Sequence, residues 1–164
     1  MVGIDDSACS QAAVDYVRKM RWPVGSRVVV LTVVTAPIGS FGAAHPPEGR
    51  AFESALESQR SYQAALAEGA LRVLREAGLP AETRVSFGDP REDLVEFARV
   101  ERADLLVVGS HGRTGLSRLL MGSVAAHVVA HAPCSVLVVK QQPADHDPAP
   151  APSQRATPPV STSP

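Results

Sequence analysis

The chain of 164 residues has few aromatic side chains, only two cysteines and almost no net charge. Aromatic residues make up 4% of the chain against 45% for all apolar residues, so a core must be built from Val, Leu and Ala. This composition favours parallel strands covered by helices over an aromatic-rich β-sandwich. The net charge of −1 gives no electrostatic reason to expect a nucleic acid or an anionic membrane as partner.

Disulfide frameworks and targeting segments are also missing. Cys9 and Cys134 are too few for a disulfide framework and indicate a reducing compartment. No N-terminal stretch has the basic-then-apolar layout of a signal peptide, and the longest apolar runs are far too short to span a bilayer. We therefore expect a cytoplasmic protein that binds neither membranes nor nucleic acids.

Hydrophobic periodicity predicts strands that alternate with helices. Continuous aliphatic runs are typical of strands buried on both faces of a parallel sheet, and alternating polarity is typical of an edge strand, here 82–87. The predicted strands are 1–5, 27–34, 82–87, 105–108 and 135–139. Helical spacing predicts helices near 7–20, 51–77, 90–98 and 123–132. The alternation predicts an α/β three-layer sandwich with helices on both faces of a five-stranded parallel sheet.

Two segments have compositions unsuited to a core. Residues 36–49 are rich in Pro, Gly and small side chains, which predicts a mobile surface loop. Beyond Lys140 the chain becomes rich in Pro, Ala, Ser and Thr, and it cannot bury enough apolar surface to offset its ordering entropy. We therefore expect one domain over 1–140 and a disordered tail over 141–164.

A glycine-punctuated loop follows the fourth predicted strand. Gly109 and Gly112 let backbone N–H groups approach oxygen atoms closely, and the helix that begins after the loop adds unpaired N–H donors and a favourable dipole. Arg113 or Arg118 can neutralise charge. In parallel sheets, ligands bind beyond the carboxyl ends of strands where the winding reverses. No Walker A sequence occurs, so a phosphate site must depend on this loop.

The glycine spacing resembles the ATP-binding branch of the universal stress protein family. Gly109, two residues, Gly112, nine residues and then Gly122-Ser123 match its signature. Ile4-Asp5-Asp6-Ser7 resembles its opening motif, with Asp6 in place of the usual glycine. The likeness covers roughly residues 1 to 140. It implies a Rossmann-like adenine-nucleotide-binding fold with strand order 3-2-1-4-5.

The resemblance also implies a ligand and a partner. It places adenine and ribose near Asp5 and the backbone of Val33, and ribose and phosphates in the glycine loop. ATP is the implied nucleotide, with Mg²⁺ or Mn²⁺. Family members usually form homodimers by pairing their last strands, here through Val136 and Val138. The implied nucleotide-binding residues are Asp5, Val33, Gly109, Gly112, Arg113, Gly122, Ser123 and Val124.

Purely structural interpretations stay open for several of these residues. The two loop glycines can be turn formers, Asp5 a turn or capping residue, and Ser123 a helix N-cap. His111 can contact phosphate or face solvent. His127 and His131 have a spacing compatible with metal ligation, but no third ligand accompanies them.

The sequence leaves three functions open. The first is an ATP-binding regulatory protein of the stress response, a dimeric switch that acts on an unidentified regulatory protein partner. The second is a slow ATPase or a nucleotidyl-transfer enzyme that uses the same site. No in-line base is evident for it, so no catalytic residue is predicted. The third is a nucleotide-free dimeric scaffold.

Overall fold

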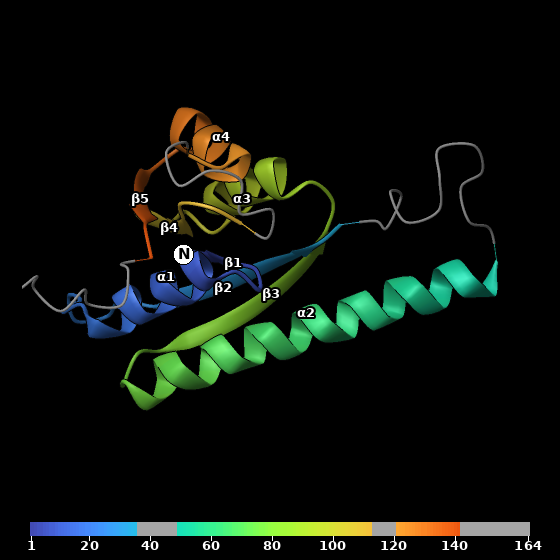
Figure 1. Cartoon of the computed structure of the whole chain (residues 1–164). Coiled ribbons are helices and arrows are strands. Elements are labelled where there is room, and N and C mark those ends of the chain that lie inside the picture. The colour runs from blue at the N-terminus through green and yellow to red at the C-terminus, as the bar shows by residue number, and fades with distance from the viewer. Residues whose placement is uncertain (36–48, 113–120, 142–164) are drawn as a thin grey trace, which may run out of the picture.

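The computed structural model describes residues 1–35, 49–112 and 121–141 (Figure 1). Most of the predicted loop at 36–49, the two loop arginines 113 and 118, and the tail beyond Gln141 lie outside these residues. Within them, strands and helices alternate as predicted. The elements are β1 (Val2–Ile4), α1 (Ala8–Lys19), β2 (Val28–Val34), α2 (Arg50–Glu76), β3 (Ala81–Phe87), α3 (Pro90–Val100), β4 (Leu105–Gly109), α4 (Ser123–His131) and β5 (Ser135–Val139).

The strands form one parallel sheet in the order β3-β2-β1-β4-β5, which confirms the predicted order. The central strand β1 pairs with β2 through Val2 and Val30, and with β4 through Val2 and Val107. The chain therefore adds strands on one side of β1 and then crosses to the other. This reversal places the carboxyl ends of β1 and β4 at the switch point of the sheet, where α/β folds bind ligands.

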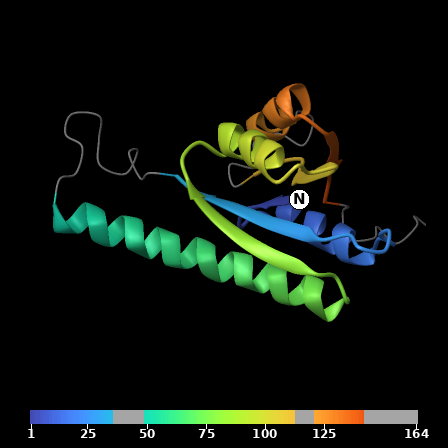
Figure 2. The ribbon, with the colours of Figure 1, turned by 180° about the vertical axis from the view of Figure 1, so that it is seen from behind.

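Helices α1 and α2 cover one face of the sheet, and α3 and α4 cover the other (Figure 2). Side chains of β2 alternate between the faces because successive residues of a strand point in opposite directions. Val28 and Val30 pack in one core cluster with α1 and α2, whereas Leu31 and Val33 pack in the other with α3 and α4. The first turns of α2 extend beyond the sheet (Figure 1). No helix in the described ranges is long and apolar enough to cross a membrane.

Local signals account for the helix ends. Ser7 caps α1, because its side chain accepts a hydrogen bond from the backbone N–H of Ser10. Pro90 is the first residue of α3, where a backbone N–H would have no partner within the helix, so proline loses no hydrogen bond there. Gly78 follows α2 with φ of +79°, the left-handed conformation that the sequence predicted there.

Asp89 caps α3 and carries a pH-dependent contribution to stability. Hydrogen bonds from the Arg91 side chain, and then from its backbone N–H, lower the pKa of Asp89 from 3.8 to about 2. Because the folded pKa lies below the unfolded one, the stabilisation is complete above about pH 4 and is lost as the pH falls towards 2.

We expect Asp89→Asn, which keeps a capping oxygen, to reduce the loss of unfolding free energy between pH 4 and pH 2. The pair is exposed, so the difference should be below about 1 kcal/mol. Urea denaturation at several pH values checks this. Equal acid sensitivity in the two proteins would contradict it.

Candidate functional site

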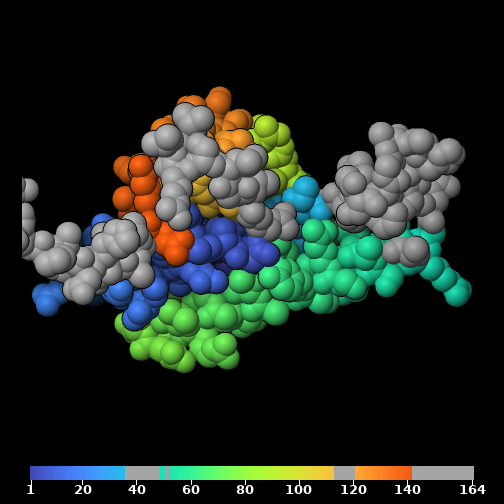
Figure 3. Space-filling model, viewed as in Figure 1, coloured from blue at the N-terminus to red at the C-terminus, as the bar shows by residue number. Residues whose placement is uncertain are grey.

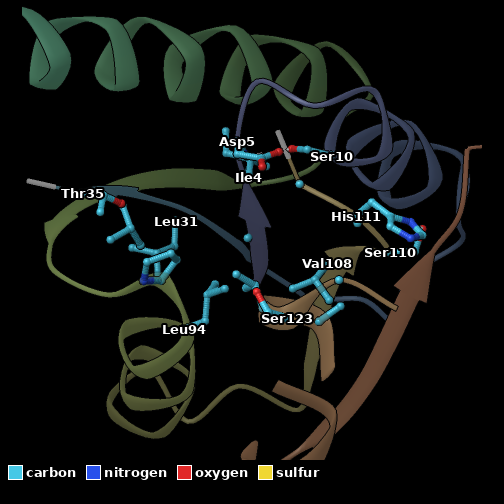
Figure 4. A pocket seen from close by; sticks show the side chains of 18 of the residues that line it. Ile4, Asp5, Ser10, Leu31, Thr35, Leu94, Val108, Ser110, His111 and Ser123 are labelled. Carbon is cyan, nitrogen blue, oxygen red and sulfur yellow. Dashed lines mark hydrogen bonds between the residues drawn. The ribbon is translucent and has the colours of Figure 1, made fainter. Parts of the chain in front are cut away.

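A pocket opens at the carboxyl ends of β1, β2 and β4, at the switch point of the sheet (Figure 4). Its walls come from the ends of these strands, from the glycine loop and from the first residues of α4. Arg113 lies outside the described residues. The predicted site residues that line the pocket are Asp5, Val33, Gly109, Gly112, Gly122, Ser123 and Val124.

Asp5 links the end of β1 to the glycine loop. Its Oδ1 accepts hydrogen bonds from the backbone N–H of Ser7 at 3.0 Å and from the Ser7 hydroxyl at 2.5 Å. The same hydroxyl lies 3.2 Å from the carbonyl oxygen of His111. Behind them, the hydroxyl of Ser10 accepts from the Asp5 backbone N–H at 3.0 Å. These contacts hold the Asp5 carboxylate beside the glycine loop.

The two interpretations of Asp5 apply to different oxygen atoms. Oδ1 accepts the backbone N–H of Ser7, which is the turn-forming role that the sequence left open for Asp5. Oδ2 faces the glycine loop, since a Cβ atom built on Gly112 would lie 2.8 Å from it. Asp5 therefore organises the turn with one oxygen and presents the other to the pocket.

At the glycines of the loop, other atoms of the protein lie close to the glycine backbone. A Cβ atom on Gly109 would lie 2.8–2.9 Å from atoms of Cys9 and Ser10, at the start of α1. A Cβ atom on Gly122 would lie 3.2 Å from the carbonyl oxygen of Ser110, which accepts the Gly122 N–H at 2.9 Å. Of the three glycines Gly109, Gly112 and Gly122, which belong to the described ranges, Gly112 alone is exposed and meets no neighbouring backbone atom at an added Cβ.

The start of α4 forms the far wall of the pocket. Gly122 occupies the N-cap position, so the interpretation of Ser123 as the N-cap is wrong. The physical reason is that Gly122 already has an extended backbone, with ψ of 154°, and Ser123 is the first helical residue. Gly122 has no side chain that could cap the helix. The first N–H groups of α4 are therefore free of a side-chain cap and can meet an anion.

The pocket is apolar where it crosses the end of β2. Leu31, Val33 and Leu94 line this part, and Val33 is only 9% exposed. A flat aromatic ring fits such surroundings. The buried side chain of Gln63, from α2, also lines the pocket.

Sequence reasoning missed Gln63. The signal that could have found it is its place in the helical pattern, seven residues after Leu56 and seven before Ala70, in the apolar stripe of α2. A polar residue in such a stripe needs a partner inside the protein.

The histidine and cysteine side chains among the described residues contact other protein groups. The rings of His127 and His131 stack at 4.2 Å, and no group of three or more His, Cys, Asp or Glu suited to a metal ion occurs among the described residues. His111 lines the pocket, with Nδ1 at 3.0 Å from Ser110 Oγ (Figure 4). Ser110 Oγ in turn lies 3.7 Å from Cys9 Sγ. Burial raises the pKa of the Cys134 thiol.

The curated proteins to which this chain is similar include universal stress proteins from two organisms. A universal stress protein of Methanocaldococcus jannaschii is 46% identical over 70 residues, 43% of this chain and 41% of that protein. A putative universal stress protein of Staphylococcus aureus is 36% identical over 102 residues, 60% of this chain and 61% of that protein. These matches span less than two thirds of either relative.

Solved structures share the fold over most of the chain. The hypothetical protein MJ0577 has a TM-score of 0.72 at 27% identity, covering 87% of this chain and 96% of that one. A universal stress protein in complex with cAMP has a TM-score of 0.54 at 28% identity, with coverages of 84% and 92%. One from Archaeoglobus fulgidus in complex with dAMP shares the fold at 21% identity and a TM-score of 0.53, with coverages of 85% and 94%. A model described as the universal stress protein family matches residues 1–140, and this chain belongs to that family.

Proposed function

We propose that this chain binds an adenine nucleotide, with ATP as its ligand. The observation that carries the proposal is the convergence of three features on one pocket. They are the Asp5 carboxylate, the exposed backbone of Gly112 and the N-terminus of α4, whose N-cap residue Gly122 has no side chain. The structural neighbour at 28% identity that is in complex with cAMP supports an adenine nucleotide as the ligand.

The residues suggest how ATP would lie. Asp5 Oδ2 accepts hydrogen bonds from ribose hydroxyl groups, and the apolar wall at Val33 and Leu94 packs against adenine. The backbone of Gly112 and the start of α4 hold the phosphates. A Mg²⁺ or Mn²⁺ ion would be held mainly by the phosphate oxygens, because the described residues offer no cluster of protein ligands for it.

Amide chemical shifts test the location of the ligand. When ATP is added, the backbone amides of Gly109, Gly112 and Gly122 should shift, because they line the pocket. Gly25 and Gly78 lie outside it and serve as internal controls. Shifts confined to residues elsewhere would place the nucleotide outside this pocket and overturn the proposal.

We further propose that the bound nucleotide regulates the protein rather than being consumed. The Asp5 carboxylate is engaged with Ser7, and no other carboxylate lines the pocket in the part of the chain that the structure describes. A regulatory effect requires that ATP bind two conformations or assembly states with different affinity. Sedimentation velocity with and without ATP tests this. Saturable binding that changes neither shape, assembly nor partner affinity would contradict the switch.

Slow ATP hydrolysis is the second candidate, since both Asp5 and His111 line the pocket and could orient water. Phosphate release with Mg²⁺ should then fall in both Asp5→Ala and Gly112→Val. Release that persists unchanged in both variants would come from a contaminating enzyme.

We propose a homodimer that pairs through β5. This strand is an edge of the sheet, and its side chains reach the surface (orange-red in Figure 3). Val136 and Val138 pack on the α3 and α4 side of the sheet and remain partly exposed. Pairing two such edges would cover their unpaired backbone groups.

Val136→Lys should convert a dimer into a monomer in sedimentation equilibrium, because a charge would enter the paired edge. Thr83→Lys, on the opposite edge strand β3, is the matched control and should leave the dimer intact. Thermal unfolding of both variants verifies that they fold. A folded Val136→Lys protein that still forms dimers would exclude pairing through β5.

A further inference from the structure

Gln63 is one of the few buried polar side chains among the described residues. It is 2% exposed and lies in the middle of α2, facing β2. The hydroxyl of Thr32, itself 1% exposed, donates a hydrogen bond to Gln63 Oε1. In this arrangement Oε1 points towards Thr32, and the Nε2 amino group is directed away from it.

The Nε2 group of Gln63 has two N–H donors and no hydrogen-bond partner among the described residues, whereas the same side chain lines the pocket. Within the described ranges, the fully buried side-chain atoms that lack a partner do not include Nε2, so this group is open to the pocket rather than sealed in the core. A pocket ligand that offers an acceptor would receive a hydrogen bond from Nε2.

The position of Gln63 identifies which part of the ligand it meets. Gln63 accepts its hydrogen bond from Thr32 on β2, whereas the glycine loop, which we propose binds the phosphates, follows β4. Strand β1 lies between them, and neighbouring strands are about 4.8 Å apart, so the two groups are separated by about 10 Å across the sheet. That distance is comparable to the length of a nucleoside. Gln63 therefore lies at the nucleoside end of the pocket.

We infer that Gln63 is a specificity-determining residue, whose Nε2 group donates a hydrogen bond to an acceptor on the nucleoside part of the bound nucleotide. This inference rests on the proposed binding of an adenine nucleotide. The acceptor is a ring nitrogen of adenine or a ribose hydroxyl oxygen. Thr32 is a positioning residue that keeps the donor end of the amide towards the ligand. Guanine presents an N1–H donor where adenine has an acceptor, so an Nε2 donor next to that atom would discriminate against guanine.

Gln63→Leu is the primary test, measured by calorimetric titration with ATP and with inorganic triphosphate. We expect the affinity for ATP to fall about 10- to 100-fold, the usual effect of losing a buried ligand hydrogen bond. Inorganic triphosphate should bind both proteins equally, because it reaches only the glycine loop and α4. A loss of both affinities to the same extent would indicate a merely structural role and would overturn the inference.

Gln59→Leu is the matched control. Gln59 is the same residue type on the same helix, one turn earlier, and it does not line the pocket. Its Oε1 is buried without a hydrogen-bond partner within the described ranges, so its removal should not weaken ATP binding. Thr32→Val keeps the shape of the side chain and removes the hydroxyl. It should lower the affinity for ATP while leaving that for inorganic triphosphate unchanged.

Nucleotide analogues identify the acceptor. The difference in affinity between wild type and Gln63→Leu should vanish for one of 1-deaza-, 3-deaza-, 7-deaza-, 2′-deoxy- or 3′-deoxy-ATP, which each lack one acceptor. A difference that persists for all five would overturn the inference. If the wild type binds ATP and Gln63→Leu binds it equally well, the inference alone fails. If the wild type does not bind ATP, the proposed function fails and the inference with it.

Discussion

Gly112→Val is expected to lower the affinity for ATP at least about 100-fold while the domain remains folded. A Cβ atom at this position would lie 2.8 Å from Asp5 Oδ2, and the two methyl groups of valine would fill the space beyond it. The substitution therefore displaces the carboxylate and blocks the backbone approach that phosphate oxygens need. Gly112 is exposed, and its φ is not positive, so the folded backbone accepts a side chain.

Calorimetric titration with ATP and Mg²⁺ measures this effect. Gly69→Val is the control, because Gly69 lies on α2, away from the pocket, with nothing within 4 Å of an added Cβ. Thermal unfolding of the two variants should give similar midpoints. An affinity of Gly112→Val within threefold of the wild type would show that the phosphates do not lie against this loop.

Gly109→Ala is expected to lower the free energy of unfolding by about 1–3 kcal/mol, the usual cost of adding an atom to a packed interior. The added Cβ would lie 2.8 Å from the backbone carbonyl carbon of Cys9 and 2.9 Å from the backbone nitrogen of Ser10. These are backbone atoms at the start of α1, so the strain is relieved only if the helix moves away from β4. Ser10 also holds the Asp5 backbone N–H, so ATP affinity should fall as well.

Urea denaturation of the wild type, Gly109→Ala and Gly122→Ala measures this loss. Gly122 is the milder case, because its added Cβ would come no closer than 3.2 Å to its neighbours. Gly109→Ala should therefore be the less stable variant. A stability within about 0.5 kcal/mol of the wild type, which is the usual range for exposed surface sites, would mean that α1 does not press on the end of β4.

Most of the fold follows from short-range patterns in the sequence. The aliphatic run that ends at Val34 was predicted to begin at 27 and begins at Val28, and the last strand matches at both ends. Caps at Ser7 and Asp89 act within a few residues of the helices that they begin, so they can be recognised locally. The order of the strands, in contrast, was implied by the family resemblance.

Local patterns predicted less well which side chains a helix buries. Tyr16 and Met20 have the spacing of the apolar face of α1, yet they are 39% and 43% exposed. The helix ends at Lys19, before Pro23, and its buried face includes Ser10. Close contact of α1 with β4 favours small residues there, and that packing depends on tertiary structure.

For the pocket, the motif identified the backbone elements but not the side chains that arrive from elsewhere. Gly112 and Gly122 belong to a spacing that can be read in the sequence. The contacts from Ser7 to His111 and from Thr32 to Gln63 join residues 104 and 31 positions apart. No local period connects such pairs, so they emerge only when the sheet and α2 are assembled.

The most direct test of nucleotide binding is calorimetric titration of the purified wild-type chain with ATP and Mg²⁺, after any bound nucleotide has been removed. The proposed site at the switch point of the sheet predicts saturable binding of one ATP per chain, with competition by AMP at the same site. No detectable heat, together with no displacement of a fluorescent adenine nucleotide at millimolar ATP, would contradict the account. The protein would then be a scaffold with the universal stress protein fold.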